Sequence, residues 1–322
     1  MKKLTFWMLL AIVAPVSVSS LSAQTLKQGT ISNVTRLTND ATSYENPRWS
    51  PDGSKIAFTE YGFNGLFVMN PDGLGKTKLA GDNGIGFMYQ WSADSHEILV
   101  RDLRYEQQYG ETKRCQAAWS IDMTGKKTRL TEDVSRMDQV AWRYSPNGDK
   151  KVISLDAKVI AHPTTKLSKS LATSLSNKTG SNISLLVNAE GLSVINARGT
   201  KTLINDKPSF CPALSPDGKK IAFNELNDIY IINIDGSGKR RLATGFNPVW
   251  VNDSQIVFEV STDDGHVYTS SDLYMMNVNG TGLKALTATT NKMEMCPSIS
   301  PDGSKIVFIS HSDGQIYSAD FK

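Results

Sequence analysis

Cysteine and histidine are scarce in this chain, which holds three cysteines and four histidines among its 322 residues. No Cys-x-x-Cys or His-x-x-x-His spacing occurs, so a structural zinc site is not indicated, and we expect no metal and no cofactor. Cys211 and Cys296 each precede a proline at the same point of a repeated sequence, which puts them too far apart around a ring for a disulfide. We expect them to be small buried apolar residues of inner strands.

The usual signatures of catalysis are also missing. The chain has no Gly-x-Ser-x-Gly nucleophile elbow, and its histidines (His96, His162, His266 and His311) are scattered. Gly73-Leu74-Gly75-Lys76-Thr77 resembles the end of a phosphate-binding loop, but Asn70 stands where that motif needs a glycine. We therefore expect no catalytic residues and no metal ligands, and we favour a non-enzymatic protein.

Long apolar runs are confined to the start of the chain. Residues 1–23 combine a charged Lys2-Lys3 start, an apolar stretch and a small residue, Ala23, which is typical of a cleaved secretory signal peptide. As a membrane anchor the stretch is shorter than the ~20 residues that a spanning helix needs. We expect export to the periplasm, with secretion as the alternative, and no membrane span after cleavage.

Strong net charge is absent as well, since 35 basic and 32 acidic side chains give a formal net charge of +3 at pH 7. A nucleic-acid partner would favour a basic patch or stripe, which this composition does not indicate. We expect a monomer that binds no nucleic acid.

What the chain does have is a strand-turn-strand pattern in six copies. The copies are WSPDGSKIAF at 49–58, WSADSHEILV at 91–100, YSPNGDKKVI at 144–153, LSPDGKKIAF at 214–223, WVNDSQIVF at 250–258 and ISPDGSKIVF at 299–308. Each of the first five is followed by a second strand-turn-strand segment that should complete its blade, for example LSVINARGTKTLI at 192–204 after the third copy and DIYIINIDGSGKRRLA at 228–243 after the fourth. Units of ~40–50 residues with four strands each are typical of propeller blades.

The turn residues explain the recurrence. Pro51 presets φ for a turn, Asp52 supplies a side-chain acceptor, and Gly53 tolerates positive φ. In the copy at 144–153 one extra residue separates Tyr144 from Val152, and in the copy at 250–258 one residue is missing between Trp250 and Ile256, so we expect bulged or reshaped turns there. The apolar residue before each turn, such as Trp49 or Trp91, should pack between neighbouring blades.

The two chain ends complement each other. After the sixth copy the chain gives one more strand, Gln315–Asp320, and then stops, so the last blade lacks its outer strand. Val34–Thr38 resembles the segments that end other blades and can supply it, which removes two sheet edges. We therefore predict one all-β domain over residues 24–322, a six-bladed β-propeller of four-stranded antiparallel blades closed by the N-terminal strand.

A Ser/Thr/Lys-rich insertion at about 156–190 interrupts this pattern. Leu167, Leu171 and Leu175 are spaced to share one face of a short helix. The segment is either such a helix, serving as a flap over one face of the disc, or a solvated loop.

The candidate binding surface is the ring of residues just before each inner strand, which should surround the mouth of the central channel. Aromatic side chains and methionines with a few carboxylates and amides form a plausible docking surface. The alternative is blade-edge packing around a water-filled channel. The predicted binding residues are Tyr44, Glu45, Asn46, Phe87, Met88, Gln139, Phe210, Phe246, Asn247 and Glu294.

The P-x-W-S-P-D-G-x-K-I-A-F and N-x-D-G-x-G-x-x-x-L halves of the repeat resemble the TolB-like, WD-like repeat β-propellers over residues 34–322. The resemblance implies a scaffold that docks an envelope protein or peptide, such as a peptidoglycan-associated lipoprotein. TolB itself carries an α/β domain before the propeller, and we expect that domain to be absent here. Oligogalacturonate lyases have similar repeats, so a polysaccharide-processing enzyme or a glycan-binding propeller are the alternatives.

Overall fold

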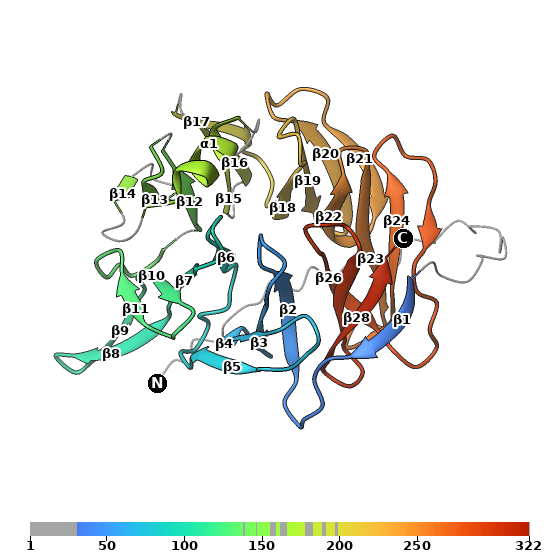
Figure 1. Ribbon diagram of the computed structural model, residues 1–322, viewed down its shortest axis with the longest axis horizontal. Helices are drawn as coiled ribbons and strands as arrows, with labels where there is room; N and C mark the ends of the chain where they lie inside the picture. Colours follow the sequence, from blue (N-terminus) through green and yellow to red (C-terminus); the bar gives the residue numbers. More distant parts are fainter. Residues whose placement is uncertain are drawn as a thin grey trace.

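The computed structural model describes residues 31–137, 139–145, 147–154, 159–161, 166–177, 183–188, 191–196 and 199–321. The predicted signal peptide, residues 1–23, and His162 lie outside these residues. Antiparallel sheets surround a central axis like the blades of a propeller (Figure 1). Among the described residues, no helix has the length and apolar character needed to cross a bilayer.

Each of the six repeat copies forms the inner hairpin of its own blade, which confirms the six predicted blades and the all-β class. The first blade contains β2 (Tyr44–Trp49), β3 (Ile56–Glu60), β4 (Asn64–Met69) and β5 (Thr77–Ala80). The second contains β6 (Gln90–Trp91), β7 (Glu97–Arg101), β10 (Ala118–Asp122) and β11 (Lys127–Arg129). A separate hairpin, β8 (Arg104–Gln108) and β9 (Glu111–Cys115), is inserted between β7 and β10.

The remaining repeat-bearing blades follow the same order. The third contains β12 (Val140–Tyr144), β13 (Lys150–Ser154) and β14 (Val159–Ala161). The fourth contains β18 (Phe210–Leu214), β19 (Lys220–Glu225), β20 (Asp228–Asn233) and β21 (Arg240–Thr244). The fifth contains β22 (Phe246–Asn252), β23 (Gln255–Asp263), β24 (Tyr268–Asn277) and β25 (Lys284–Ala285). The sixth contains β26 (Glu294–Ile299), β27 (Lys305–Ser310), β28 (Gln315–Phe321) and β1 (Ile31–Arg36).

The stretch between the third and fourth repeat copies departs from the prediction. Residues 192–204 were expected to complete the third blade, but they belong to an additional three-stranded sheet, β15 (Ser184–Asn188), β16 (Gly191–Asn196) and β17 (Gly199–Ile204). The third blade accordingly has three strands in the described residues, where four were expected. The additional sheet carries no Ser-Pro-Asp-Gly turn, and its inner strand β15 contacts the inner strands β12 and β18. It therefore stands in the ring between the third and fourth blades.

The predicted closure of the ring is confirmed. β1 pairs antiparallel with β28, with Thr35 opposite Ser318 and Arg36 opposite Tyr317. Leu37 N then donates to Ile316 O at 2.8 Å, so the pairing continues to the end of the predicted segment. The N-terminal strand thus satisfies the edge of the last blade, which would otherwise be open.

The repeated turns are held by their own side chains. In the first copy Ser50 Oγ donates to Asp52 Oδ1 at 2.6 Å, and Lys55 N donates to Ser50 Oγ at 2.9 Å. Gly53 adopts φ 73°, where a side chain would be strained. The expected reshaping of two turns is confirmed: Ser145 N bonds to Asp149 O, one residue closer than in the first copy, and the register shifts between Trp250 and Asn252.

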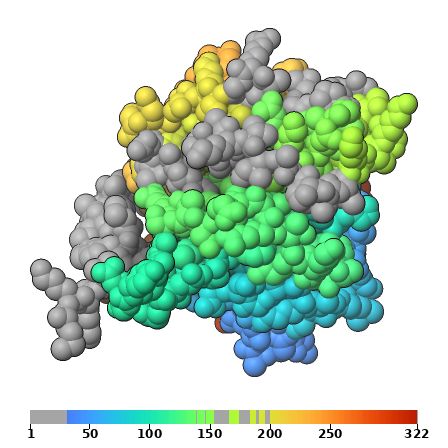
Figure 2. Space-filling model, turned by 90° about the vertical axis from the view of Figure 1, so that its left-hand side faces the viewer, coloured from blue at the N-terminus to red at the C-terminus, as the bar shows by residue number. Residues whose placement is uncertain are grey.

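Indole groups connect neighbouring inner strands, as expected for residues that pack between blades. Trp91 Nε1 donates to Arg48 O at 3.3 Å, and Trp250 Nε1 donates to Ala213 O at 2.9 Å. Trp142 makes the same kind of bond to Gln90 O at 3.2 Å. Figure 2 views the disc from its edge, with the first blade in blue and cyan, the second in turquoise and green, and yellow residues, around 200–220, at the top.

Part of the insertion is the helix α1 (Lys169–Asn177), so the helical alternative is confirmed for Leu171 and Leu175. Leu167 precedes the helix and is buried in the core of the third blade with Trp142 and Ala172. Its amide donates to Gly148 O at 2.9 Å, in the turn between β12 and β13.

Connections alternate between the two faces of the disc because neighbouring strands of a blade are antiparallel. We call the face with the Ser-Pro-Asp-Gly turns the turn face. The opposite face carries the loops between second and third strands and the connections from blade to blade, and we call it the mouth face. Since α1 is attached to a repeat turn at Gly148, it lies on the turn face, away from the residues that precede the inner strands.

Candidate functional site

The inner strands enclose a central cavity of about 590 Å³. Its walls come from the first to sixth blades and from β15 of the additional sheet, so it is the channel of the propeller. The lining is mainly apolar and includes four equivalent prolines, namely Pro47, Pro212, Pro248 and Pro297. Such a channel suits a ligand that is largely apolar and is fixed by a few polar groups.

Left-handed residues stand at the same place in five inner strands or just before them. Their φ values lie between 47° and 56°, although none is glycine: Asn46, Met88, Cys211, Asn247 and Cys296. In four of the five the strand register shifts at this point, which marks a β-bulge. Positive φ at non-glycine residues costs of order 1–3 kcal/mol each and is concentrated at functional sites. The repeated bulges are therefore a specific structural feature of the channel mouth, and they mark it as a candidate functional site.

Hydrogen bonds within the fifth blade and between the fourth, fifth and sixth blades hold these bulges in place. The amide of Asn247 donates to Asn224 Oδ1 at 3.1 Å, and the amide of Cys296 donates to Glu259 Oε2 at 2.5 Å. Asn247 Nδ2 donates to Glu259 Oε1 at 3.0 Å, and Cys211 Sγ donates to Asn247 Oδ1 at 2.9 Å. The rim from the fourth to the sixth blade is thus one connected polar network.

Burial controls the ionisation of two groups in this network. Glu259 is 5% exposed, and its desolvation raises the pKa of its carboxyl to about 7, although both oxygens accept hydrogen bonds. Cys211 faces the channel, but the surrounding protein desolvates it and raises the pKa of its thiol to about 11. A thiol with that pKa is a poor nucleophile at neutral pH.

Six of the ten predicted binding residues line the cavity: Asn46, Phe87, Met88, Gln139, Phe210 and Asn247. Phe87 and Phe210 remain 41% and 51% exposed, and they precede or begin the inner strands β6 and β18. Along the ring β6, β12, β15, β18 these two strands are three positions apart. The two phenyl rings therefore stand on roughly opposite sides of the mouth.

The other four predicted residues lie outside the lining. Tyr44 is buried and donates from its hydroxyl to Asp40 Oδ2 at 2.9 Å, and Glu294 is buried and accepts from Thr289 Oγ1 at 2.8 Å. Glu45 accepts from Phe63 N at 2.5 Å, and burial raises the pKa of its carboxyl. Phe246 is half-buried. None of the four lines the cavity, so a binding role for them at the mouth stays a prediction.

Sequence reasoning missed three kinds of residue at this site. Arg48 lines the channel two residues after the Asn46 bulge, and Glu259 supports the rim from the second strand of the fifth blade. The expectation that Cys211 and Cys296 are buried is wrong for Cys211, which is exposed, while Cys296 is half-buried. Because the bulge rotates these residues toward the channel, their thiols take part in its lining.

Exposed apolar side chains are concentrated on the mouth face. In the described part of the chain twelve large hydrophobic residues are exposed, and all but Val34, Leu74 and Leu283 belong to connections of this face. The nine are Tyr61, Phe87, Tyr105, Tyr109, Val134, Phe210, Leu226, Val267 and Tyr268. Leu74 and Leu283 lie on the turn face. Scattered surface hydrophobics need no explanation, but this segregation to one face points to an interface.

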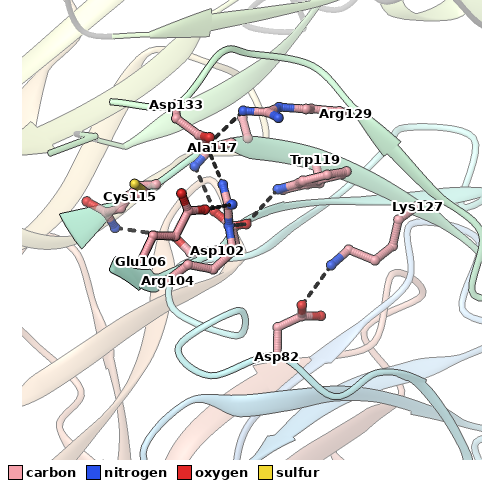
Figure 3. Close-up of polar contacts among 12 residues, drawn as sticks. Asp82, Asp102, Arg104, Glu106, Cys115, Ala117, Trp119, Lys127, Arg129 and Asp133 are labelled. Carbon is pink, nitrogen blue, oxygen red and sulfur yellow. Dashed lines mark hydrogen bonds and ion pairs between the residues drawn. The ribbon is translucent and has the colours of Figure 1, made fainter. Parts of the chain in front are cut away.

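The β8–β9 hairpin extends this face beyond the second blade and carries Tyr109 at its tip, 99% exposed. Its base is fixed by the buried carboxylate of Asp102, which accepts from Ala117 N at 2.7 Å and from Trp119 Nε1 at 3.0 Å (Figure 3). Arg104 Nε adds a 2.7 Å ion pair to the same carboxylate. The hairpin is therefore anchored at its root, which holds its tyrosines in position.

The three histidines that the structure describes, His96, His266 and His311, do not form a metal or catalytic centre with other described residues. His96 is exposed beside Asp94, with 3.5 Å between Nδ1 and Oδ2, and His311 contacts the ring of Tyr268 at a centroid distance of 5.6 Å. Across the residues that the structure describes, no group of three or more His, Cys, Asp or Glu side chains could hold a metal ion. The expectation of no metal and no catalytic residue stays a prediction.

Comparisons with known proteins agree with the fold. Residues 192–322 match the family model described as the TolB beta propeller domain. The protein TolB homolog of Chlorobium luteolum is 28% identical over 109 residues, which is 32% of this chain and 24% of that relative. The matched region thus spans about a quarter of the relative's length.

Two solved structures have the same architecture. The β-propeller domain of Cps50 (Swd1) from Myceliophteria thermophila has a TM-score of 0.53 and 12% identity, covering 90% of this chain and 100% of that one. A putative TolB from Agrobacterium tumefaciens has a TM-score of 0.50 and 16% identity, covering 90% and 97%. At these identities the likeness concerns the fold alone.

Proposed function

We propose that this β-propeller, whose residues 192–322 match the TolB beta propeller domain model, is an exported, non-enzymatic scaffold that docks an envelope protein or peptide at the mouth of its central channel. The periplasm is the proposed compartment. A peptidoglycan-associated lipoprotein is the kind of partner that the TolB likeness suggests.

The observation that carries this proposal is the segregation of exposed apolar side chains to the mouth face. Aromatic side chains are enriched at the centre of protein interfaces, where a few buried anchors supply most of the binding energy. Phe87 and Phe210 meet this description because they stand at the channel itself and are only half covered. Phe87 is held by an edge contact with Phe63 at 5.2 Å between ring centroids, so little side-chain freedom is lost on binding.

The rigid rim supports the same function. The bulges of the fourth to sixth blades are hydrogen-bonded through Asn224, Asn247 and Glu259 before any partner arrives. Pre-organisation of this kind lowers the entropic cost of binding. A partner segment that projects into the channel would meet a preformed cavity with apolar walls.

The alternatives are a lyase acting on acidic polysaccharide, of the oligogalacturonate-lyase type, and a glycan-binding propeller. The first needs a metal with clustered ligands, and the described residues offer no such cluster. The second needs aromatic platforms, which the mouth has, so it differs from peptide docking only in the ligand. An assay with oligogalacturonate and divalent metal, following the ultraviolet absorbance of the unsaturated product, separates the enzyme from both binders.

Docking can be tested with two matched double variants. Phe87→Ala with Phe210→Ala removes the anchors at the mouth, and Leu74→Ala with Leu283→Ala removes two exposed apolar side chains from the turn face. Loss of one central anchor costs about 2 kcal/mol or more, or roughly thirtyfold in affinity. We expect the first pair to lose the partner that is cross-linked in the native envelope, with an unchanged melting temperature, and the second pair to keep it. Equal binding by both double variants would contradict the proposal.

A further inference from the structure

Arg48 is the one charged side chain among the described residues that line the channel. It projects from β2 and is exposed to the cavity. Its Nε donates to Asn46 Oδ1 at 3.2 Å, and its guanidinium carbon lies 5.4 Å from the centroid of the Tyr89 ring. These contacts orient the guanidinium from one side and leave its terminal nitrogens available to the cavity.

No described carboxylate is within ion-pairing distance of Arg48. Other arginines of the molecule have such partners: Arg104 pairs with Asp102 at 2.7 Å, and Arg241 pairs with Asp228 at 2.7 Å. A guanidinium stays charged at all physiological pH values, so Arg48 puts a fixed positive charge into an apolar channel.

The channel also leaves room around this charge. At the position of Arg48 in the repeat, four other inner strands carry uncharged and mostly small side chains, namely Gln90, Ala213, Val249 and Ser298, and all of them line the cavity. The third copy has Arg143 at this position, but Arg143 is not part of the described lining. Four prolines lie one residue nearer the mouth and supply apolar walls. An anionic group that enters between Phe87 and Phe210 would therefore meet no charged residue of the described lining except Arg48, although the guanidinium of Arg101 lies 5.3 Å from the centroid of the Phe87 ring at the entrance.

We propose that the channel binds a carboxylate of its partner, an acidic side chain or a chain end of an inserted peptide, with Arg48 as the counter-ion. Guanidinium and carboxylate match in shape, since two parallel N–H groups can face two oxygens. The surrounding prolines and indoles keep the local dielectric low and so strengthen the pairing. This inference rests on the proposed peptide-docking function and adds the chemistry that selects the peptide.

The test is a selection of peptides from a fully random heptapeptide phage library on the immobilised mature chain. The wild type, Arg48→Gln, Arg48→Lys and Lys207→Gln are compared. Lys207 is exposed in the connection before β18, on the same face but outside the channel lining, so its variant controls for loss of a charge. Melting temperatures of all four proteins establish that each is folded.

We expect the wild type and Lys207→Gln to enrich peptides containing Asp or Glu, and Arg48→Gln to lose that enrichment. Individual acidic peptides should bind Arg48→Gln about 10- to 100-fold more weakly than wild type, as for loss of one charge-assisted hydrogen-bonded pair. Arg48→Lys should retain part of the affinity because it keeps the charge and loses the paired geometry.

Two results would overturn the inference while leaving the docking function intact: enrichment of peptides without acidic residues, or acidic enrichment that is equal on Arg48→Gln. If no peptide is enriched on any variant, peptide docking itself fails and the inference fails with it. A second experiment measures the binding of trigalacturonate, an acidic sugar, to the same variants by calorimetry. Arg48-dependent binding of this sugar without peptide enrichment would assign the carboxylate to a glycan and contradict the peptide.

Discussion

Glu259 offers the sharpest physical test of how the channel rim is built. Its carboxylate accepts hydrogen bonds from Cys296 N and Asn247 Nδ2, yet it is 5% exposed, and burial raises its pKa from the usual 4.5 to about 7. The folded protein therefore retains a proton on this group at pH values where the unfolded chain has lost it. The resulting stability is fully present below about pH 4.5 and is lost as the pH rises through 7.

The size of the effect follows from the two pKa values. They differ by about 2.5 pH units, and each unit corresponds to about 1.4 kcal/mol, which gives about 3 kcal/mol in total. Most of this, about 2–3 kcal/mol, should be lost between pH 5 and pH 8.5. Glu259→Gln is close in shape to the protonated acid and does not titrate, so the variant should lack this component.

Urea unfolding at pH 5 and pH 8.5 measures the difference for the wild type and for Glu259→Gln. We expect the free energy of unfolding to fall by about 2–3 kcal/mol more in the wild type than in the variant. Glu132→Gln, which replaces an exposed carboxylate, should behave like the wild type. If Glu259→Gln shows the same pH dependence as the wild type, the desolvation argument for the rim is refuted.

Two further predictions concern the ring itself. Deleting residues 24–40 removes β1, opens an edge of the sixth blade and should sharply lower the melting temperature; a truncated chain that melts like the full mature chain would contradict closure by the N-terminal strand. Lys150→Met removes the buried ammonium that pairs with Asp94 at 2.6 Å and Glu97 at 3.2 Å, and should cost about 3–5 kcal/mol in urea unfolding. Lys151→Met, at the neighbouring position, is its control, and equal losses in both variants would show that the ion pairs are not responsible.

The sequence predicts the blades well because the repeat contains its own turn chemistry. Ser50, Asp52 and Gly53 make the same local hydrogen bonds in the structure as the pattern indicates, and these bonds need nothing from the rest of the chain. The closure of the ring is also predictable from the sequence. The sixth repeat lacks a fourth strand, and the segment before the first repeat resembles the fourth strands of other blades.

The additional sheet could not be recognised in the same way. Its hairpin between β15 and β16 carries none of the repeated turn residues, and β15 lies in the polar insertion. An apolar run, Ile183–Val187, was available as a signal. This run could not be recognised as an inner strand, however, because it does not lead into a copy of the repeated turn as the other inner strands do.

The channel lining was only partly predictable because bulges interrupt the alternation of strand side chains. The shift between Glu45 and Arg48 leaves Tyr44 in the core and turns Asn46 to the channel. Without the bulge, residues of one strand would be assigned to faces by a simple period of two. The charge of Arg48 was only a weak signal: four other copies have Gln90, Ala213, Val249 and Ser298 at this position, but the third copy has Arg143, which does not line the channel.

The central claim, that the mouth face docks an envelope partner, is tested most directly by photo-cross-linking in intact cells. A benzoylphenylalanine replaces Phe210 at the mouth or Leu283 on the turn face, and the adducts are identified by mass spectrometry. We predict one defined envelope protein cross-linked from position 210 and none from position 283. The same adduct from both positions, or adducts from position 283 alone, would contradict the account.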